Sequence, residues 1–395
     1  MKIAAVLVDA AVLGSVGAAL LLGPRLLRVP ATAPGAAPEI PSKSPSGSAA
    51  ASVRARRPVP PEALLAAVTA VLYLNQLFCS AYLLRVHGGD TSFVARYLPA
   101  GWFDQPTGNP LVRALADRLP APRLFAPTVL RVQAFLELPF VLLAYATVLR
   151  RLSPALHRTV LGSAPLAWTA ALSYTVVFST VEWALYNPWT LQDVALRVLS
   201  ALLTVPLLLA LARRDTGPDR HPGTLGLLHF AVTLWALGTL VMVVYDTALL
   251  YNLGHLPTRW PLALFALLLL AATARRPADP VTPGPATRAL ATLLRRGLVL
   301  FLIPALAVRY GLGYPHPAIA LAGALLIAAA TLTHRQVRTA ALPLTLSCAA
   351  GLATACLALH LTADTYPETG LLRAMVTLPA TAALVAHLTD RRRTG

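Results

Sequence analysis

The sequence predicts an all-α, polytopic transmembrane helical bundle with about eleven spans, its N-terminus outside and its C-terminus in the cytoplasm. Hydrophobic residues make up 56% of the 395 residues and charged residues 12%, whereas a soluble domain carries about 25% charged residues. Apolar blocks of about 17 to 25 residues recur along the chain, each long enough to cross about 30 Å of hydrocarbon as a helix. Blocks of this length without alternation exclude a β-barrel.

Residues 1–28 are predicted to form an N-terminal transmembrane anchor. The apolar block 3–22 follows the single Lys2 and precedes Arg25 and Arg28, a charge order that places the N-terminus outside. A cleaved secretory signal would carry its positive charge ahead of the block, and Asp9 fits such a signal poorly. If this segment is cleaved or does not span, about ten spans remain.

The rest of the chain divides into three parts. Residues 29–61 are rich in Pro, Ala and Ser and are predicted to be a disordered linker, because few apolar side chains offset the entropy of ordering. Residues 62–390 are predicted to form the transmembrane helical domain, with an extracytoplasmic loop at 85–125, and residues 391–395 a basic cytoplasmic tail. The further predicted spans are 62–84, 126–149, 159–186, 190–212, 225–253, 260–274, 297–312, 317–332, 339–361 and 371–388.

The arginines orient these spans. When the spans alternate, the basic clusters fall on one side of the membrane: 150–151, 213–214, 275–276, 295–296, 335–338 and 391–393. By the positive-inside rule this side is the cytoplasm, which predicts a multi-pass protein of the cell membrane. The preference for Arg over Lys, with many Ala, Leu and Pro residues, is typical of coding by a GC-rich bacterial genome.

Two amphipathic segments are predicted to lie at the membrane surfaces. In the outer loop, Asn109 and Pro110 are typical of a helix cap followed by proline at the first helical position. On the cytoplasmic side, residues 285–296 are predicted to form a second such helix, with Leu290 and its neighbours facing lipid.

Three acidic residues inside the predicted spans are the main candidates for function, because a carboxylate in hydrocarbon costs a few kcal/mol and needs an explanation. Glu137 lies midway through its span, two residues before Pro139, where a kink would open the backbone. Glu182 and Asp246 are each followed by a Tyr-Asn pair, which adds Asn187 and Asn252 to the candidates.

The predicted topology places basic counter-charges at the same depth as these acids. Arg131 and Arg197 lie in the same outer half, so the arrangement predicts a polar cavity open to the outside, with a substrate-binding or proton-relay role. The alternative is that Glu137 pairs with Arg131 or another basic residue only to hold the helices together.

Several kinds of chemistry lack their sequence patterns. The chain has no GxxxxGK[ST] motif, no HExxH motif and no paired Cys/His spacing, so we expect no cofactor and no metal site. The net charge of +17 is spread over the ends of the apolar blocks, so nucleic acid is not an expected partner. Membrane lipids are the expected partners.

Three functions remain open. The first is a transporter- or permease-like protein for a small or lipidic molecule, favoured by the buried acids and the mid-membrane prolines. The second is a membrane-embedded enzyme, a glycosyl- or other group transferase acting on a lipid-linked substrate at the outer face. For this alternative, the loop with Asp90 and Asp104 is loosely similar to the first large extracytoplasmic loop of polyprenyl-phosphate-sugar glycosyltransferases, a resemblance that implies an acidic general base or metal ligand there. The third is a structural subunit of a membrane complex, favoured by the small-residue helix at 317–332.

Overall fold

The computed structural model describes the backbone of residues 2–27, 60–90, 107–120, 122–184, 189–215, 222–249, 253–274, 282–312, 316–361 and 367–394. Side chains are described in the same ranges apart from residues 2, 122–131, 309–310, 367–372, 375 and 393–394. Within these ranges every regular element is a helix, and no strand occurs. The predicted linker at 29–61 falls almost entirely outside the described residues.

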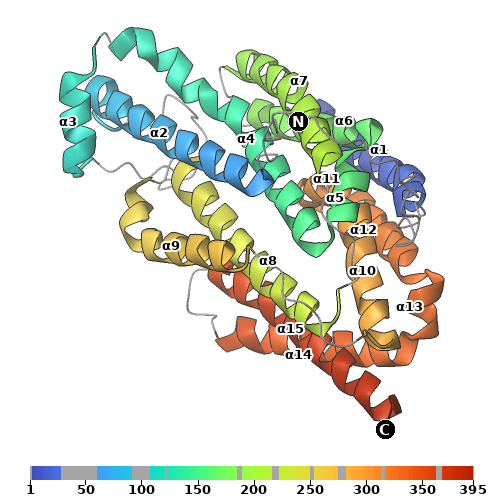
Figure 1. The fold of residues 1–395 in the computed structure, drawn as a ribbon. Helices are drawn as coiled ribbons and strands as arrows, with labels where there is room; N and C mark the ends of the chain where they lie inside the picture. The colour runs from blue at the N-terminus through green and yellow to red at the C-terminus, as the bar shows by residue number, and fades with distance from the viewer. Residues whose placement is uncertain are drawn as a thin grey trace, which may run out of the picture.

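The long helices run back and forth through one bundle (Figure 1). They are α1 (Lys2–Leu27), α2 (Pro61–His87), α4 (Pro122–Leu152), α6 (Ala164–Ala184), α7 (Thr190–Arg214), α8 (Thr224–Val244), α9 (Leu256–Ala272), α10 (Pro285–Leu302), α12 (Pro317–Leu332), α14 (Ala341–Leu361) and α15 (Pro367–Thr394). Shorter elements are α3 (Pro110–Arg118), α5 (Pro154–Leu161), α11 (Pro304–Leu312), α13 (Arg335–Thr339), the π-helical turn η1 (Tyr245–Leu249) and the 3-10 turn η2 (Leu253–His255).

The length and composition of these helices fit a membrane. Within the described ranges, eight helices are long and apolar enough to cross one. Large apolar side chains stay exposed along them, among them Leu203 on α7 and Leu268 on α9, as a lipid-facing surface requires. The predicted fold class, an all-α polytopic membrane bundle, is therefore confirmed.

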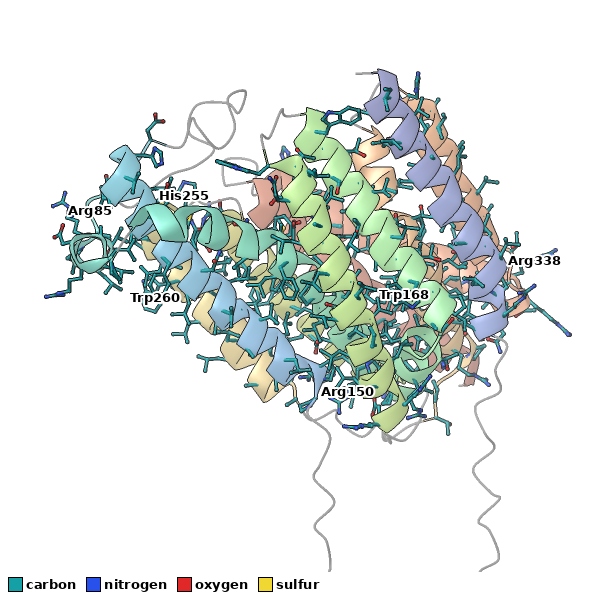
Figure 2. All side chains as sticks on the ribbon, turned by 90° about the horizontal axis from the view of Figure 1, so that it is seen from above. Arg85, Arg150, Trp168, His255, Trp260 and Arg338 are labelled. Atoms are coloured by element: carbon teal, nitrogen blue, oxygen red, sulfur yellow. The ribbon has the colours of Figure 1, made fainter. Side chains whose placement is uncertain are left out.

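Polar side chains at one end of the bundle tie α2, α4, α5 and α7 together. Arg150 and Arg151 both pair with Glu62, at 2.9 and 3.0 Å. The carboxylate of Asp215 pairs with Arg150 at 3.4 Å and with the fully buried ring of His157 at 2.9 Å. We call this the Arg150 end; Figure 2 shows Arg85, at the far end of α2, on the opposite side of the bundle.

The helix predicted from Asn109 and Pro110 is present as α3; its place on the outer membrane surface stays a prediction. The side chain of Asn109 accepts hydrogen bonds from the backbone N–H groups of Leu111 and Val112, and Pro110 occupies the first helical turn. The side chain of Val112 is buried, while Leu111 is 61% exposed. Asn109 thus satisfies two of the N–H groups that a helix start leaves without partners.

The prediction for residues 285–296 is wrong in two respects. This segment is the first part of α10, which continues without a break to Leu302, so it is not a separate surface helix. Leu290 is 3% exposed and belongs to a core cluster with Val337 and Leu344, so it does not face lipid. The chain breaks instead at Pro304, which begins α11 and cannot continue the hydrogen-bond ladder of α10.

Tertiary contacts hold α10 in place from its first turn. Asp390 of α15 accepts hydrogen bonds from the backbone N–H of Ala286 at 2.9 Å and of Thr287 at 3.0 Å. Gly284 leaves room for this carboxylate, because a Cβ there would lie 2.3 Å from its Cγ. A buried carboxylate from a distant helix therefore caps α10 where a local side chain would normally do so.

Candidate functional site: a buried arginine between two carboxylates

Glu137 lies inside the bundle on α4 and is 6% exposed. Two residues later, Pro139 has no N–H, so the carbonyl of Phe135 loses the donor that a helix normally supplies four residues on. The hydroxyl of Ser200 on α7 donates to this carbonyl at 2.5 Å. The backbone opening predicted from Pro139 is thus filled by α7, which brings that helix close to the acid.

Arg197, one turn before Ser200 on α7, joins two of the predicted acids. Its side chain is 3% exposed, and its Nη2 atom donates to Glu182 Oε1 on α6 at 2.7 Å and to Glu137 Oε2 on α4 at 3.4 Å. One guanidinium therefore connects three helices. The cluster of Glu137, Glu182 and Arg197, which we call the Arg197 cluster, holds one more carboxyl group than guanidinium.

Aromatic side chains enclose the Arg197 cluster. The hydroxyl of Tyr245 donates to Glu137 Oε1 at 2.6 Å. The guanidinium carbon of Arg197 lies 5.4 Å from the ring centroid of Phe178, in cation–π range. Tyr174 stacks on Phe178, with their ring centroids 4.5 Å apart. These contacts cover Arg197 and Glu137, where an exposed charge would be costly in lipid, while the Glu182 side chain stays 19% exposed.

The third predicted acid, Asp246, belongs to a different cluster. Its carboxylate lies 3.1 Å from the ring Nδ1 atom of His255 and 3.6 Å from Arg259 Nε. Asp246 directly follows Tyr245 in the π-helical turn η1, so neighbouring residues point to different partners. π-Helical turns are frequent at functional sites because the extra residue re-aims side chains in this way.

Three predicted candidates cannot be placed. The side chain of Arg131 lies outside the described residues, as do Asn187 and Asn252 in full. The Tyr-Asn pairs that relate Glu182 to Asp246 in the sequence are therefore untested by the structure. Residues 91–106, most of the predicted outer loop with Asp104, also lie outside the described part.

Sequence reasoning missed Tyr245, Ser200 and Tyr174. Because Pro139 has no N–H, the sequence indicates that the Phe135 carbonyl needs another donor. It does not indicate which helix supplies that donor. Tyrosine and serine are ordinary residues in apolar helices, and their positions around Phe135 and Glu137 arise only when α4, α6, α7 and η1 pack together.

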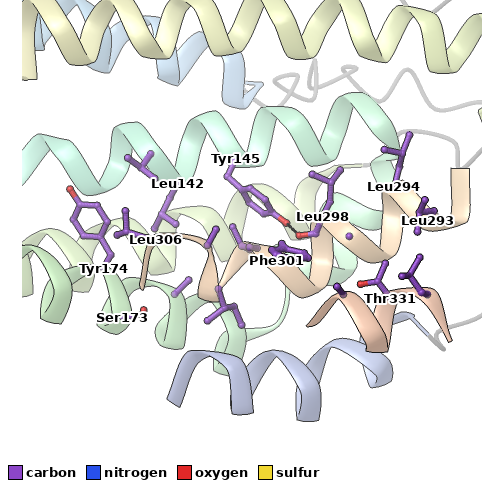
Figure 3. A pocket seen from close by; sticks show the side chains of 18 residues that line it. Leu142, Tyr145, Ser173, Tyr174, Leu293, Leu294, Leu298, Phe301, Leu306 and Thr331 are labelled. Carbon is purple, nitrogen blue, oxygen red and sulfur yellow. Dashed lines mark hydrogen bonds between the residues drawn. The ribbon is translucent and has the colours of Figure 1, made fainter. Parts of the chain in front are cut away.

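A cavity of about 800 Å³ lies next to the Arg197 cluster, among α4, α6, α10, α11 and α12 (Figure 3). Most of its lining side chains are apolar, including Leu142, Phe301 and Leu306. The acids of the Arg197 cluster do not line this cavity, and the polar cavity predicted from the sequence stays a prediction. Among the described residues, no three His, Cys, Asp or Glu side chains are grouped to hold a metal ion.

No protein-family model, no curated protein and no solved structure matches this chain.

Proposed function

We propose that this protein is a transporter- or permease-like membrane protein that moves a small or lipidic molecule, with the Arg197 cluster as its proton relay. The observation that carries the proposal is the pairing of a buried guanidinium with two carboxylates from different helices. An ion pair in a membrane interior is expensive to maintain, and carriers use such groups to couple protons to movement.

The charge balance of the cluster supports a relay. Two carboxyl groups share one guanidinium, so the cluster is neutral only when one carboxyl group holds a proton. A proton that arrives at Glu137 weakens its attraction to Arg197 and leaves the shorter pair with Glu182. The ion pair between α4 and α7 therefore depends on the protonation of Glu137.

A second polar group adjoins the Arg197 cluster in the chain, at η1 and η2. Tyr245 contacts Glu137, and the adjacent Asp246 contacts His255, whose side chain is 37% exposed. Under the predicted topology this exposed histidine lies toward the outside of the cell. The order His255, Asp246, Tyr245, Glu137 thus provides groups for proton exchange between the outer surface and the Arg197 cluster.

Proton uptake into proteoliposomes tests the proposal. The full chain is reconstituted with a total lipid extract of the producing cells as the pool of substrates, the vesicles are loaded with the pH dye pyranine, and the outside is acidified. We expect the wild-type protein to acidify the interior faster than protein-free vesicles, and Glu137→Gln to abolish this difference.

Asp117→Asn is the matched control, because this carboxylate is exposed on α3 and lies outside the Arg197 cluster. It should retain the wild-type rate, and circular dichroism should show equal helix content in all three proteins. Wild-type vesicles no faster than protein-free ones, or Glu137→Gln vesicles as fast as the wild type, would overturn the proposal.

A further inference from the structure

The cavity beside the Arg197 cluster has an uncharged lining. Figure 3 draws the 18 residues that form it, and none of them is charged. Its polar side chains are the hydroxyl groups of Tyr145, Ser173, Tyr174 and Thr331. A cavity of about 800 Å³ with a mainly apolar wall and a few polar groups has the size and character of a small-molecule site.

The four hydroxyl groups differ in their hydrogen-bond partners. Tyr145 donates to the carbonyl of Leu298 at 2.7 Å, and Thr331 donates to the carbonyl of Ile327 at 2.8 Å. Ser173 is 7% exposed and its hydroxyl group has no hydrogen-bond partner, whereas the hydroxyl group of Tyr174, 3% exposed, interacts with Glu137. A buried hydroxyl without a partner is costly, so Ser173 indicates a ligand that supplies one, with the adjacent Tyr174 beside it.

These two hydroxyl groups lie at the end of the cavity that adjoins the Arg197 cluster. Val141, which lines the cavity, follows Glu137 by one turn on the same face of α4. On α6, Tyr174, Phe178 and Glu182 follow one another at intervals of one turn, so they share a face as well. A head group held by Tyr174 would therefore sit two turns before Glu182 on α6, near the cavity end of the Arg197 cluster.

The cavity is elongated along α10 and α11. Its lining extends from Leu293 to Leu306, which corresponds to about 20 Å of helix. In Figure 3 the leucines at 293 and 294 lie at the opposite end from Tyr174. This length suits an extended hydrocarbon chain. A charged head group would find no counter-charge in the lining, and its desolvation would not be offset by an ion pair.

We infer that the cavity binds an uncharged lipid with a long hydrocarbon body and a single hydroxyl or carbonyl head group. The head group hydrogen-bonds to Tyr174 and Ser173, and the hydrocarbon body follows α10 toward Leu293. The inference rests on the proposed function, since it assigns the substrate class to the cavity that adjoins the relay.

Gly297 offers a way to fill the cavity without disturbing the fold. It lines the cavity on α10, and a Cβ at this position would meet no atom within 4 Å. Gly297→Leu therefore places a side chain in the open volume and also improves helix propensity. Gly14 on α1 is the matched control, because its Cβ direction is equally open and it does not line the cavity.

Photolabelling of the purified full chain tests the inference. The probe is palmityl alcohol carrying a diazirine and an alkyne, and the comparison probe is palmitic acid with the same groups, used at a pH where its carboxyl group is ionised. We expect the alcohol to label residues of α4, α6 and α10 that line the cavity, and the acid to label them several-fold less. Gly297→Leu should reduce labelling by the alcohol several-fold, whereas Gly14→Leu should not.

Tyr174→Phe separates head-group recognition from simple filling of space. It should reduce labelling by the alcohol but leave labelling by an alkane diazirine unchanged, with helix content and elution volume equal to the wild type. Equal labelling of Gly297→Leu and the wild type, or stronger labelling by the acid than by the alcohol, would overturn the inference.

Photolabelling requires no transport, so the two proposals can fail separately. Glu137-dependent proton uptake without labelling of the cavity overturns the lipid site alone. Labelling of the cavity without Glu137-dependent proton uptake supports the site and overturns the transport proposal.

Discussion

Removal of the Arg197 guanidinium should strongly destabilise the fold. Arg197→Met leaves the carboxyl groups of Glu137 and Glu182 in place, with side chains that are 8% and 19% exposed, and takes away the cation that both share. The nitrogen–oxygen distances of the two ion pairs that disappear are 3.4 Å to Glu137 and 2.7 Å to Glu182. At an effective dielectric constant near 20, each charge pair at about 3 Å contributes an attraction of about 5 kcal/mol.

Much of this attraction offsets the cost of burying the charges, so the net effect is smaller. Breaking a buried ion pair by removal of one partner typically costs about 3 to 5 kcal/mol, and we expect a loss in this range. Denaturation in mixed detergent–SDS micelles, followed by circular dichroism, measures the free energy of unfolding. Arg214→Met, at the exposed end of the same helix, should change it by no more than about 0.5 kcal/mol.

A neutral version of the cluster gives the sharper comparison. The triple variant Glu137→Gln, Glu182→Gln and Arg197→Met removes all three charges, and it should recover most of the stability that Arg197→Met loses, because replacing a whole buried ion cluster is often neutral. A loss below about 1 kcal/mol for the single variant would refute this reasoning. So would a triple variant that is no more stable than the single one.

Three other substitutions test individual contacts by the same unfolding measurement. Ser200→Ala should cost about 1 kcal/mol or more by leaving the Phe135 carbonyl without a donor, and adding Pro139→Ala should restore it through a new backbone N–H; an equal loss in the double variant would contradict this. Asp390→Ala should cost about 1 to 2 kcal/mol and increase amide hydrogen exchange in the first turn of α10, and unchanged exchange there would argue against the cap. Gly351→Leu should separate α14 from α15, because a Cβ at this position would lie 2.5 Å from the backbone oxygen of the facing helix; a variant as stable as the wild type would show that this close approach is not needed.

The fold class was predictable because lipid constrains the chain locally. Each span must satisfy its own backbone hydrogen bonds and present apolar side chains, so length and hydropathy suffice to find helices such as α2 and α7. The cap at Asn109 was predictable for the same reason, since its partners lie two and three residues away. The prediction for the segment 285–296 was wrong because an amphipathic helix has the same sequence pattern whether its apolar face contacts lipid or protein. In α10 this face packs against α14 and α15.

The candidate site was predictable only in part. The cost of a charge in hydrocarbon singles out Glu137, Glu182 and Arg197, and the structure brings these three together. The same reasoning does not separate Asp246 from them, because the π-helical turn that directs Asp246 to His255 has no signature in the sequence. The apolar cavity was not predictable either, since a space between helices depends on how five of them pack.

The Arg197 ion pairs can be observed directly in a bilayer. Solid-state NMR of the full chain in liposomes, with the guanidinium nitrogens labelled with 15N and the glutamate carboxyl carbons with 13C, detects dipolar coupling between directly contacting groups. The 2.7 Å contact between Arg197 and Glu182 should give a dipolar coupling between their labelled atoms. This coupling should disappear in Glu182→Ala. A spectrum without this coupling in the wild-type protein would contradict a bundle held together by a buried arginine.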